Sequence, residues 1–183
     1  MLILIGEFAS GKSAIQKSLI EDFGFQNAVT YTTRPRQNGE LDGKHHYFIN
    51  EDTFQILENE QFFFETSKDG QWSYGGALID YQEKELCNKV GIATPHGLRQ
   101  LHRCQEINIF SVYLDIPAKD RIIKALMYED DIEKIFCRNL RQTGEYEGIS
   151  QEVDMVVKNQ GYEKPTIMLA KGIKDAYERL KDA

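Results

Sequence analysis

The chain has 183 residues, a formal net charge of −7, and a composition that is 41% hydrophobic and 28% charged. A chain of this length fits one domain, and its ordinary composition excludes the disordered and membrane-spanning classes. The acidic balance argues against a nucleic-acid-binding surface, which usually carries a basic stripe. The first apolar run ends after residue 5 and has no basic leader, so it indicates a strand and not a signal peptide. We therefore expect a cytoplasmic enzyme that binds neither membranes nor nucleic acids.

The chain opens with the stretch MLILIGEFASGKS, in which an apolar run over residues 1–5 leads into Gly6, Gly11, Lys12 and Ser13. The spacing G-x-x-x-x-G-K-S is that of a phosphate-binding loop, or P-loop. Its glycines let backbone N–H groups point together at a polyphosphate, its lysine adds a positive charge, and its serine hydroxyl suits Mg²⁺. A chance glycine-rich turn is the alternative, but the strand before the loop and the helix after it favour the P-loop. The predicted ATP-binding residues are Gly6, Glu7, Phe8, Ala9, Ser10, Gly11, Lys12, Ser13 and Ala14, with Ser13 also the predicted metal ligand.

Helical periodicity and apolar strand-like runs then alternate along the chain. Helices are predicted over residues 12–23, 51–59, 78–86, from 97, and over 118–127, 130–141 and 164–181. Strands are predicted over residues 1–5, 28–31, 47–49, 62–66, 72–74, 91–94, 107–114 and 153–157. The apolar strands separated by helices predict a parallel sheet that is covered on both faces and binds its ligand at the carboxyl ends of the strands. Short strands and glycine turns between about residues 30 and 75 predict a small antiparallel insert, ended by Gly75-Gly76, that holds a second substrate against the P-loop.

Polar residues in this insert suit a second substrate that is itself phosphorylated. Arg34 and Arg36 can form bidentate hydrogen bonds to a phosphate. Glu65 follows three phenylalanines, and a carboxylate in such an apolar setting is a selective acceptor for a ring N–H and an exocyclic amine. Tyr74 and the two glycines after it leave room for a phosphate or a base. The alternative for each residue is a structural role, as a solvated arginine, a carboxylate at a strand edge or an aromatic ring packed across a hairpin.

At these residues the sequence resembles the guanylate kinase family, as a divergent member. The segment TTRPRQNGELDGKHHYF resembles that family's Thr-Thr-Arg…Gly-Glu-x-x-Gly…Phe segment, FFFE its Phe-x-Glu segment and SYGG its Tyr-Gly segment. With the P-loop, these matches stand in the family's order and cover nearly the whole chain. The resemblance implies an α/β fold of the P-loop kinase class. Its five-stranded parallel sheet is covered by helices on both faces and carries a small mixed antiparallel insert that binds a nucleoside monophosphate (NMP), and a short helical lid.

The resemblance also implies a domain plan and residue roles. Residues 1–183 would form a single guanylate-kinase-like domain, with a core of residues 1–29 and 77–183, an NMP-binding insert over about 30–76 and a lid over about 124–141. Thr30 would supply a hydroxyl to guanine O6, Glu65 would accept from guanine N1 and N2, and Arg34 and Tyr74 would bind the monophosphate. Arg138 would bridge the two phosphate chains from the lid, where Arg121 or Arg141 are further candidates. The predicted catalytic residues are Lys12, Arg34 and Arg138, and the predicted substrate-binding residues are Thr30, Arg34, Tyr47, Glu65 and Tyr74.

Several positions depart from the family pattern. The family's second arginine falls at Gln37, and its phosphate-binding tyrosine falls at His46, with Tyr47 one place late. Gly76 stands where a small hydroxyl residue is usual, and Thr94-Pro95-His96 replaces acidic residues after a strand. The lid segment KALMYEDD lacks the family's arginine-rich run. These departures concern the acceptor and the lid, and they leave the P-loop complete.

Together these features predict ATP-dependent phosphorylation of a nucleoside monophosphate, with GMP or dGMP favoured as acceptor, ATP and Mg²⁺ as cofactors, and a monomer or homodimer as the working form. The first alternative is a non-catalytic binding module that keeps the fold and recognises a phosphorylated protein, but such modules are expected to lose the P-loop. The second is a P-loop kinase for another small phosphorylated substrate, which His96 and Gln37 suggest. Phosphoryl transfer needs positioning and positive charge more than a general base, so the predicted cations suffice in either enzyme.

Overall fold

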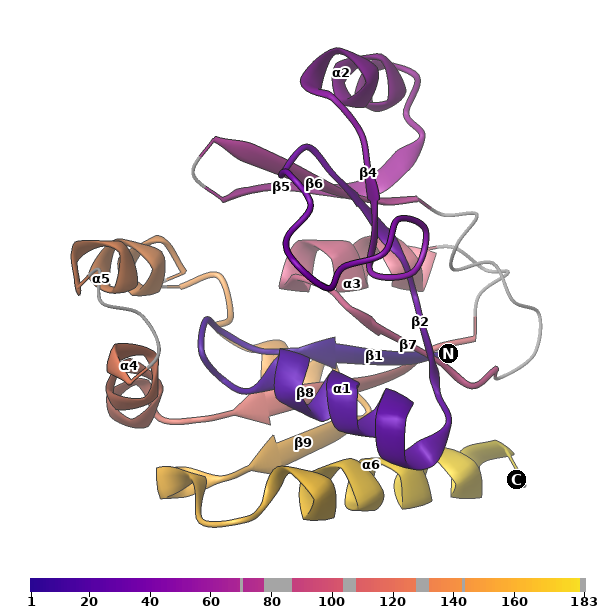
Figure 1. Cartoon of the computed structure of the whole chain (residues 1–183). Coiled ribbons are helices and arrows are strands. Elements are labelled where there is room, and N and C mark those ends of the chain that lie inside the picture. The colour runs from indigo at the N-terminus through magenta and orange to yellow at the C-terminus, as the bar shows by residue number, and fades with distance from the viewer. Residues whose placement is uncertain (70, 78–86, 104–107, 128–131, 143, 182–183) are drawn as a thin grey trace.

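A five-stranded parallel sheet forms the centre of the computed structural model, which describes residues 1–183 except 70, 78–86, 104–107, 128–131, 143 and 182–183 (Figure 1). Its strands stand in the order β2-β7-β1-β8-β9. Their bounds are Leu2–Ile5 for β1, Gln26–Asn27 for β2, Lys89–Ile92 for β7, Phe110–Asp115 for β8 and Met155–Lys158 for β9. Because β1 pairs in parallel with β7 on one side and β8 on the other, the loops after these three strands meet at one edge of the sheet.

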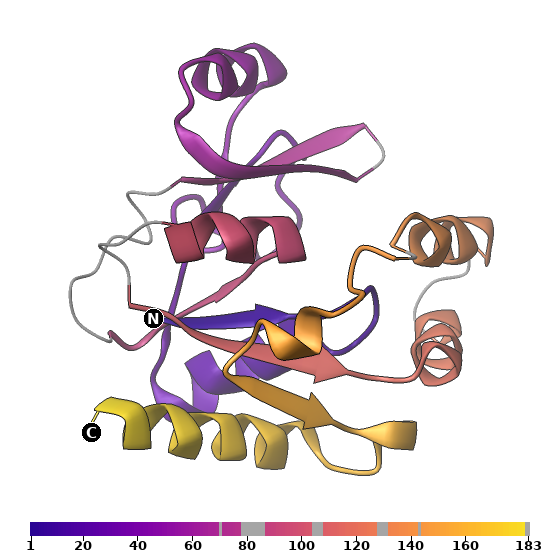
Figure 2. The same cartoon turned by 180° about the vertical axis from the view of Figure 1, so that it is seen from behind.

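Helices cover both faces of this sheet (Figures 1 and 2). They are α1 (Lys12–Phe23) and α6 (Thr166–Lys181) on one face and α3 (Pro95–Arg103) on the other. Side chains of β1 alternate between the two layers, as the pleat requires. Leu2 and Leu4 pack into the cluster that contains α1 and α6, whereas Ile3 and Ile5 pack into the cluster that contains α3. All four are fully buried, which is why this strand reads as an unbroken apolar run.

A second, four-stranded sheet lies beyond α3, above the parallel sheet in Figure 1. Its order is β4-β3-β6-β5, with β3 and β4 parallel and the other pairs antiparallel. Its elements are β3 (Thr30–Thr32), β4 (His46–Phe48), β5 (Phe63–Asp69) and β6 (Trp72–Ala77), with α2 (Glu51–Asn59) packed on β5. Strand β5 also contacts α3. The second sheet therefore rests on the same helix that covers the parallel sheet.

Two further helices lie side by side at the edge where the parallel strands end, as both ribbon views show (Figures 1 and 2). They are α4 (Ala118–Leu126) and α5 (Ile132–Arg141). Two single-turn 3₁₀ helices precede and follow β9, namely η2 (Ile149–Gln151) and η3 (Gln160–Tyr162). Helix α4 contacts both α5 and η3, so the segment after β9 is joined to the segment after β8.

The predicted α/β fold is confirmed, with a five-stranded parallel sheet between helices and a separate mixed sheet. Some boundaries differ from the prediction. In place of the one strand expected over residues 28–31, the structure has β2 just before that range and β3 from residue 30 to 32, because β2 pairs with β7 whereas β3 pairs with β4 and β6. Helix α3 begins at Pro95, before the expected residue 97, because proline fits the first turn of a helix, where an N–H has no partner within the helix. The helix expected over 78–86 lies outside the described residues.

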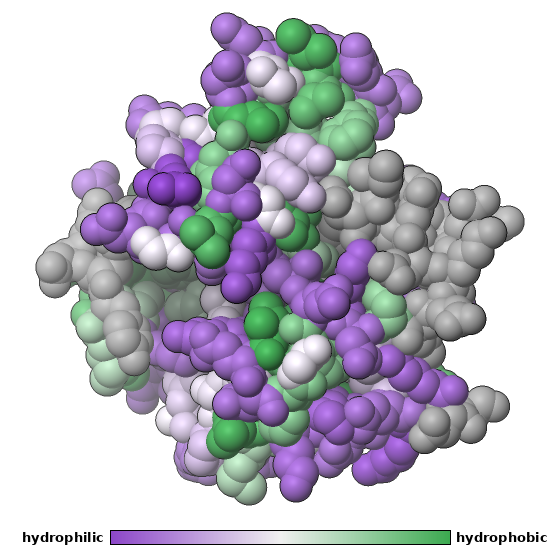
Figure 3. All heavy atoms as spheres, turned by 45° about the vertical axis from the view of Figure 1, so that its right-hand side comes forward, coloured by the Kyte–Doolittle hydropathy of each residue, from purple (hydrophilic) through white to green (hydrophobic). Residues whose placement is uncertain are grey.

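None of the helices in the described part of the chain is long and apolar enough to cross a membrane. On the face drawn in Figure 3, apolar side chains form small separate patches among hydrophilic ones. Scattered patches of this kind are ordinary on a folded protein.

The glycine pair Gly75-Gly76, which the sequence predicts to end the insert, lies within β6, just before its last residue Ala77. A Cβ on Gly75 would lie 2.7 Å from the ring of Phe63, and a Cβ on Gly76 would lie 2.7 Å from the ring of Phe64. Both rings belong to the neighbouring strand β5, and Phe63 also stacks on the buried Phe54 with ring centroids 4.7 Å apart. Aromatic packing across the strand pair therefore requires the two glycines.

We expect Gly75→Ala to destabilise the protein by about 1–3 kcal/mol, because the new methyl group must displace a ring that is stacked on α2. Urea unfolding measures the change. The matched control is Gly172→Ala in α6, where a Cβ meets no atom within 4 Å, and there we expect a gain of about 0.5–1 kcal/mol from the helix. A Gly75→Ala protein as stable as the parent would show that the Phe63 ring does not constrain this position.

Candidate active site

The loop of residues 6–13 connects β1 to α1 and carries the predicted P-loop residues. Gly11 has a φ of 96° and Ala9 a φ of 61°, so the loop turns through two left-handed positions before the helix begins. Lys12 points back into this turn, where its Nζ donates to the Gly6 carbonyl at 2.5 Å and to the Glu7 carbonyl at 2.8 Å. Burial lowers the pKa of Lys12 from 10.5 to about 8. The ammonium is thus held inside the loop by neutral carbonyls, an arrangement that an incoming anion would improve.

A buried cation beneath the loop balances the one carboxylate within it. Tyr113 donates its hydroxyl to Glu7 Oε2 at 3.0 Å, and Arg121 Nη2 lies 3.5 Å from Glu7 Oε1. Arg121 is 7% exposed and also donates Nη1 to the Phe8 carbonyl and to Asn139 Oδ1. The sequence suggested Arg121 as an arginine that closes from the lid, but the structure fixes it under the loop. Its charge offsets that of Glu7, so the carboxylate does not repel an anion from the loop.

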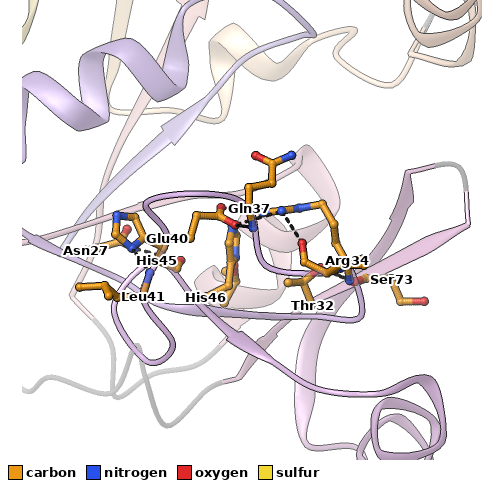
Figure 4. A network of polar contacts seen from close by, with 11 residues as sticks. Asn27, Thr32, Arg34, Gln37, Glu40, Leu41, His45, His46 and Ser73 are labelled. Atoms are coloured by element: carbon orange, nitrogen blue, oxygen red, sulfur yellow. Dashed lines mark hydrogen bonds and ion pairs between the residues drawn. The ribbon is translucent and has the colours of Figure 1, made fainter.

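Arg34, the predicted phosphate-binding arginine, is held by a bidentate ion pair at the rim of the second sheet (Figure 4). Its Nη1 and Nη2 donate to the two carboxylate oxygens of Glu40 at 3.0 and 2.6 Å. The Gln37 backbone N–H donates to the same carboxylate at 2.7 Å, whereas its side chain points away from the pair in Figure 4. The hydrogen bonds from Arg34 lower the pKa of Glu40 to about 2, so the pair stays charged at neutral pH. Gln37 therefore helps to orient Glu40, the partner of Arg34, through its backbone N–H. Its side chain supplies no second cation.

His46 and Tyr47 lie on opposite faces of β4. The register pairs Thr30 with His46 and Tyr31 with Tyr47. His46 Nδ1 lies 2.8 Å from Thr30 Oγ1, and its ring meets that of Tyr74 edge-on at 6.1 Å. Tyr47 packs on Tyr31 with ring centroids 4.6 Å apart. The structure therefore does not bring Tyr47 to the site and places His46 there in its stead, since neighbouring residues of a strand face opposite ways. Burial lowers the pKa of His46, which favours a neutral imidazole.

Glu65 reaches from β5 to the first turn of α3. Its Oε1 accepts from the Thr94 N–H at 3.0 Å, and its Oε2 occupies the space beside Gly97, where a Cβ would lie 1.9 Å away. Thr94 in turn caps α3, because its Oγ1 accepts from the Gly97 N–H at 3.1 Å. Burial raises the pKa of Glu65 to about 7, although the bonds from Thr94 oppose the rise. A carboxylate this costly to ionise is poised to accept hydrogen bonds from a ligand.

A cavity of about 1090 Å³ between the two sheets joins these groups. Five predicted site residues line it: Lys12 and Ser13 from the loop, and Thr30, Glu65 and Tyr74 from the second sheet. Arg34 is not among the lining residues, but its partner Glu40 is, and so are His46 and Thr94. The side chains of Arg138 and Arg141 lie outside the described part of the structure, so their predicted roles stay predictions.

A second cavity, of about 150 Å³, lies on the other side of the loop and was not expected from the sequence. Ser10 and Gly11 line it from the loop, Lys124 lines it from α4, and Asn159 and Tyr162 line it from the segment after β9. No short motif marks these residues, because they come together only where β8 and β9 end at the same edge of the sheet.

We expect Glu65→Gln to stabilise the free protein at neutral and alkaline pH. The folded-state pKa of Glu65, about 7, lies above its ordinary value of 4.5. The folded protein therefore keeps a proton that the unfolded chain has lost, and stability falls as pH rises from about 4.5 to 7. Glutamine keeps the shape and can accept from Thr94 but carries no charge.

The gain in unfolding free energy should be on the order of 2 kcal/mol at pH 8 and should vanish near pH 4.5, as urea titrations at both pH values measure. Glu60→Gln, at an exposed carboxylate, serves as the control and should change little at either pH. An equal gain at both pH values would mean that the Glu65 charge is not the cause.

Known proteins resemble this chain over nearly its full length. The family model for guanylate kinase matches residues 1–176. The guanylate kinase of Buchnera aphidicola subsp. Acyrthosiphon pisum is 25% identical over 171 residues, which cover 90% of this chain and 82% of the relative. That of Blochmanniella pennsylvanica is 24% identical over 196 residues, which cover 100% and 92%.

The fold has a solved counterpart in the crystal structure of guanylate kinase from Anaplasma phagocytophilum. The two match with a TM-score of 0.68 at 16% identity, over 99% of this chain and 85% of that one. At this identity the structural likeness supports the fold and nothing more. The family model, in contrast, spans almost every residue, including the 6–13 loop and both sheets. On that ground the chain belongs to the guanylate kinase family.

Proposed function

We propose that the chain transfers the γ-phosphoryl group of ATP to GMP or dGMP. The observation that carries this proposal is the single cavity lined by Lys12 and Ser13 on one side and by Thr30, Glu65 and Tyr74 on the other. A donor on the loop and an acceptor on the second sheet would meet there. The relatives named guanylate kinase support the same reaction and the same pair of nucleotides.

On the donor side, residues 6–14 act as the P-loop in this proposal. Phosphate oxygens replace the two carbonyls that now hold Lys12, and the ammonium gains an anionic partner in a site where burial had made its charge costly. Ser13 lies in the first turn of α1 and lines the cavity, and its hydroxyl is a hard oxygen ligand of the kind that Mg²⁺ binds together with nucleotide phosphates. The metal would neutralise phosphate charge during transfer.

On the acceptor side, Arg34 binds the monophosphate, with Glu40 holding its guanidinium in one orientation. Tyr74 contacts the same phosphate. The Glu65 carboxylate accepts from guanine N1–H and N2–H, and Thr30 hydrogen-bonds O6. A base that offers two donors repays the ionisation of a buried carboxylate, whereas a base without them leaves the charge unpaired, which is how such a site discriminates.

The domain plan follows from these roles. Residues 1–29 and 77–183 form the core, residues 30–76 the insert that binds the monophosphate, and residues 124–141 the lid. Arg138 of α5 closes on the phosphates from the lid and, with Lys12 and Arg34, supplies the charge along the line of transfer. The acceptor is already an anionic oxygen and needs no general base, so the lid serves chiefly to exclude water. We expect the enzyme to work in the cytoplasm as a monomer or homodimer.

One observation favours a second candidate, a P-loop kinase for another small phosphorylated substrate. The Thr30 hydroxyl is engaged by His46, at 2.8 Å, where the family pattern has a tyrosine. If this hydrogen bond persists with substrate bound, Thr30 presents a different pattern to the base. A panel of acceptors separates the two candidates.

We expect an ADP-release assay with ATP and Mg²⁺ to show turnover with GMP or dGMP above AMP, CMP and UMP. Lys12→Ala should lower turnover about 10²–10³-fold with every acceptor, because it removes charge from the transferred group. Glu65→Gln should lower the preference for GMP about 10²-fold, because glutamine replaces one of the two accepting oxygens with an NH2 group, which faces a guanine donor without bonding to it. Lys119→Ala, at an exposed lysine that lines neither cavity, is the control and should leave the rate unchanged.

The outcomes separate the parts of the proposal. Without turnover of any monophosphate by the parent protein, the kinase assignment fails and the binding-module alternative gains. If Glu65→Gln keeps the parent's base preference, only the assignment of Glu65 to guanine fails.

A further inference from the structure

A lysine outside the P-loop motif stands against the loop. Lys124 belongs to the last turn of α4, and its Nζ is 3.6 Å from the point that a Cβ on Gly11 would occupy. The same Nζ lies 3.8 Å from the centroid of the Tyr162 ring. Burial lowers the pKa of Lys124, and within the described ranges no carboxylate pairs with it. A cation whose charge is not neutralised thus lies beside a loop built to bind anions.

Contacts from three elements set the position of this cation. The Tyr162 hydroxyl donates to the Ala9 carbonyl of the loop at 2.5 Å. The Gly161 N–H donates to Asp120 Oδ2 of α4 at 2.7 Å. Tyr162 itself has a φ of 53°, a left-handed conformation that a non-glycine residue keeps only where its surroundings demand it. The Tyr162 ring, which contacts the Lys124 ammonium, is therefore held both by the loop and by α4.

The other cations described at the loop already have hydrogen-bond or ion-pair partners. Lys12 donates to two loop carbonyls, and Arg121 donates to the Phe8 carbonyl and pairs with Glu7. Among the residues that the structure describes, Lys124 makes only the weak contact with a ring face, which a cation gives up readily for an anion. It also begins the KALMYEDD segment, which lacks the arginines that the family resemblance leads one to expect there.

We propose that Lys124 binds the phosphate chain of the donor nucleotide, moving its ammonium from the Tyr162 ring to the triphosphate on the 6–13 loop. This inference rests on the proposed function, because it requires ATP at that loop. Tyr162 is then a positioning residue that keeps the ammonium beside Gly11 while the donor is absent. A lysine suits this task because its ammonium is a compact charge with three donors on a flexible stem.

A purely structural role is the competing explanation, since a cation in the last turn of a helix interacts with the helix dipole and with the ring. That role predicts a loss of stability but no effect on phosphate binding. The test is therefore ATP affinity, measured by calorimetric titration without any acceptor, in Lys124→Met, Lys124→Arg and the control Lys119→Met. Lys119 is an exposed lysine of the same helix.

We expect Lys124→Met to weaken ATP binding about tenfold or more, the scale of one lost charge-assisted hydrogen bond. Lys124→Arg, which keeps the charge, should stay within about threefold of the parent, and Lys119→Met should match the parent. Acetylation of the parent protein, followed by peptide mass spectrometry, provides a readout that needs no variant. ATP should slow the modification of Lys124 but not of Lys119, and adenosine should slow neither.

Two results would overturn the proposal, namely unchanged ATP affinity in Lys124→Met or unchanged acetylation of Lys124 with ATP. Failure of the proposed function looks different, because the parent protein would then not bind ATP at all, or Lys12→Ala would bind it equally well.

Discussion

Burial of β1 on both faces is the constraint on which the site depends. Leu2 and Leu4 anchor the strand to the layer of α1 and α6, and Ile3 and Ile5 anchor it to the layer of α3. A strand packed on both sides cannot slide or rotate, since interiors are close-packed. The 6–13 loop therefore leaves the sheet at one fixed place, between the ends of β7 and β8. Everything that binds to the loop is positioned from there.

The cavity next to β1 is lined by two groups of opposite charge, Lys12 and Glu65, and burial makes the charged form of each one costly. Burial lowers the pKa of Lys12 to about 8 and raises that of Glu65 to about 7, and in both cases the charged form is the one made costly. In the proposed complex a phosphate relieves the first cost, and a base with two N–H donors relieves the second. The empty site therefore lowers the stability of the folded protein, and bound substrates restore it. Active sites commonly reduce stability in this way.

Local signals predicted the loop between β1 and α1, whereas contacts between residues far apart in the sequence decided what those signals missed. The P-loop is read from consecutive residues, and the buried strands are read from apolar runs. In contrast, the register between β3 and β4 decides that His46 faces the cavity and Tyr47 does not. The sequence of a single strand does not reveal this register. The burial of Arg121 depends on Glu7 and Phe8, over a hundred residues earlier in the chain. Residues this far apart in sequence meet only through the sheet topology, so their pairing could not be predicted locally.

The residues that depart from the family pattern around the larger cavity are packed and hydrogen-bonded. Buried polar groups in stable folds are nearly always paired. Here Thr94 caps α3 and holds Glu65, His46 binds Thr30, and the aromatic rings of β5 account for Gly76. Within the described part of the chain, the buried side-chain polar atom left without a partner is the Oγ of Ser10, in the 6–13 loop. The residues that depart from the family pattern therefore fit one another around the larger cavity.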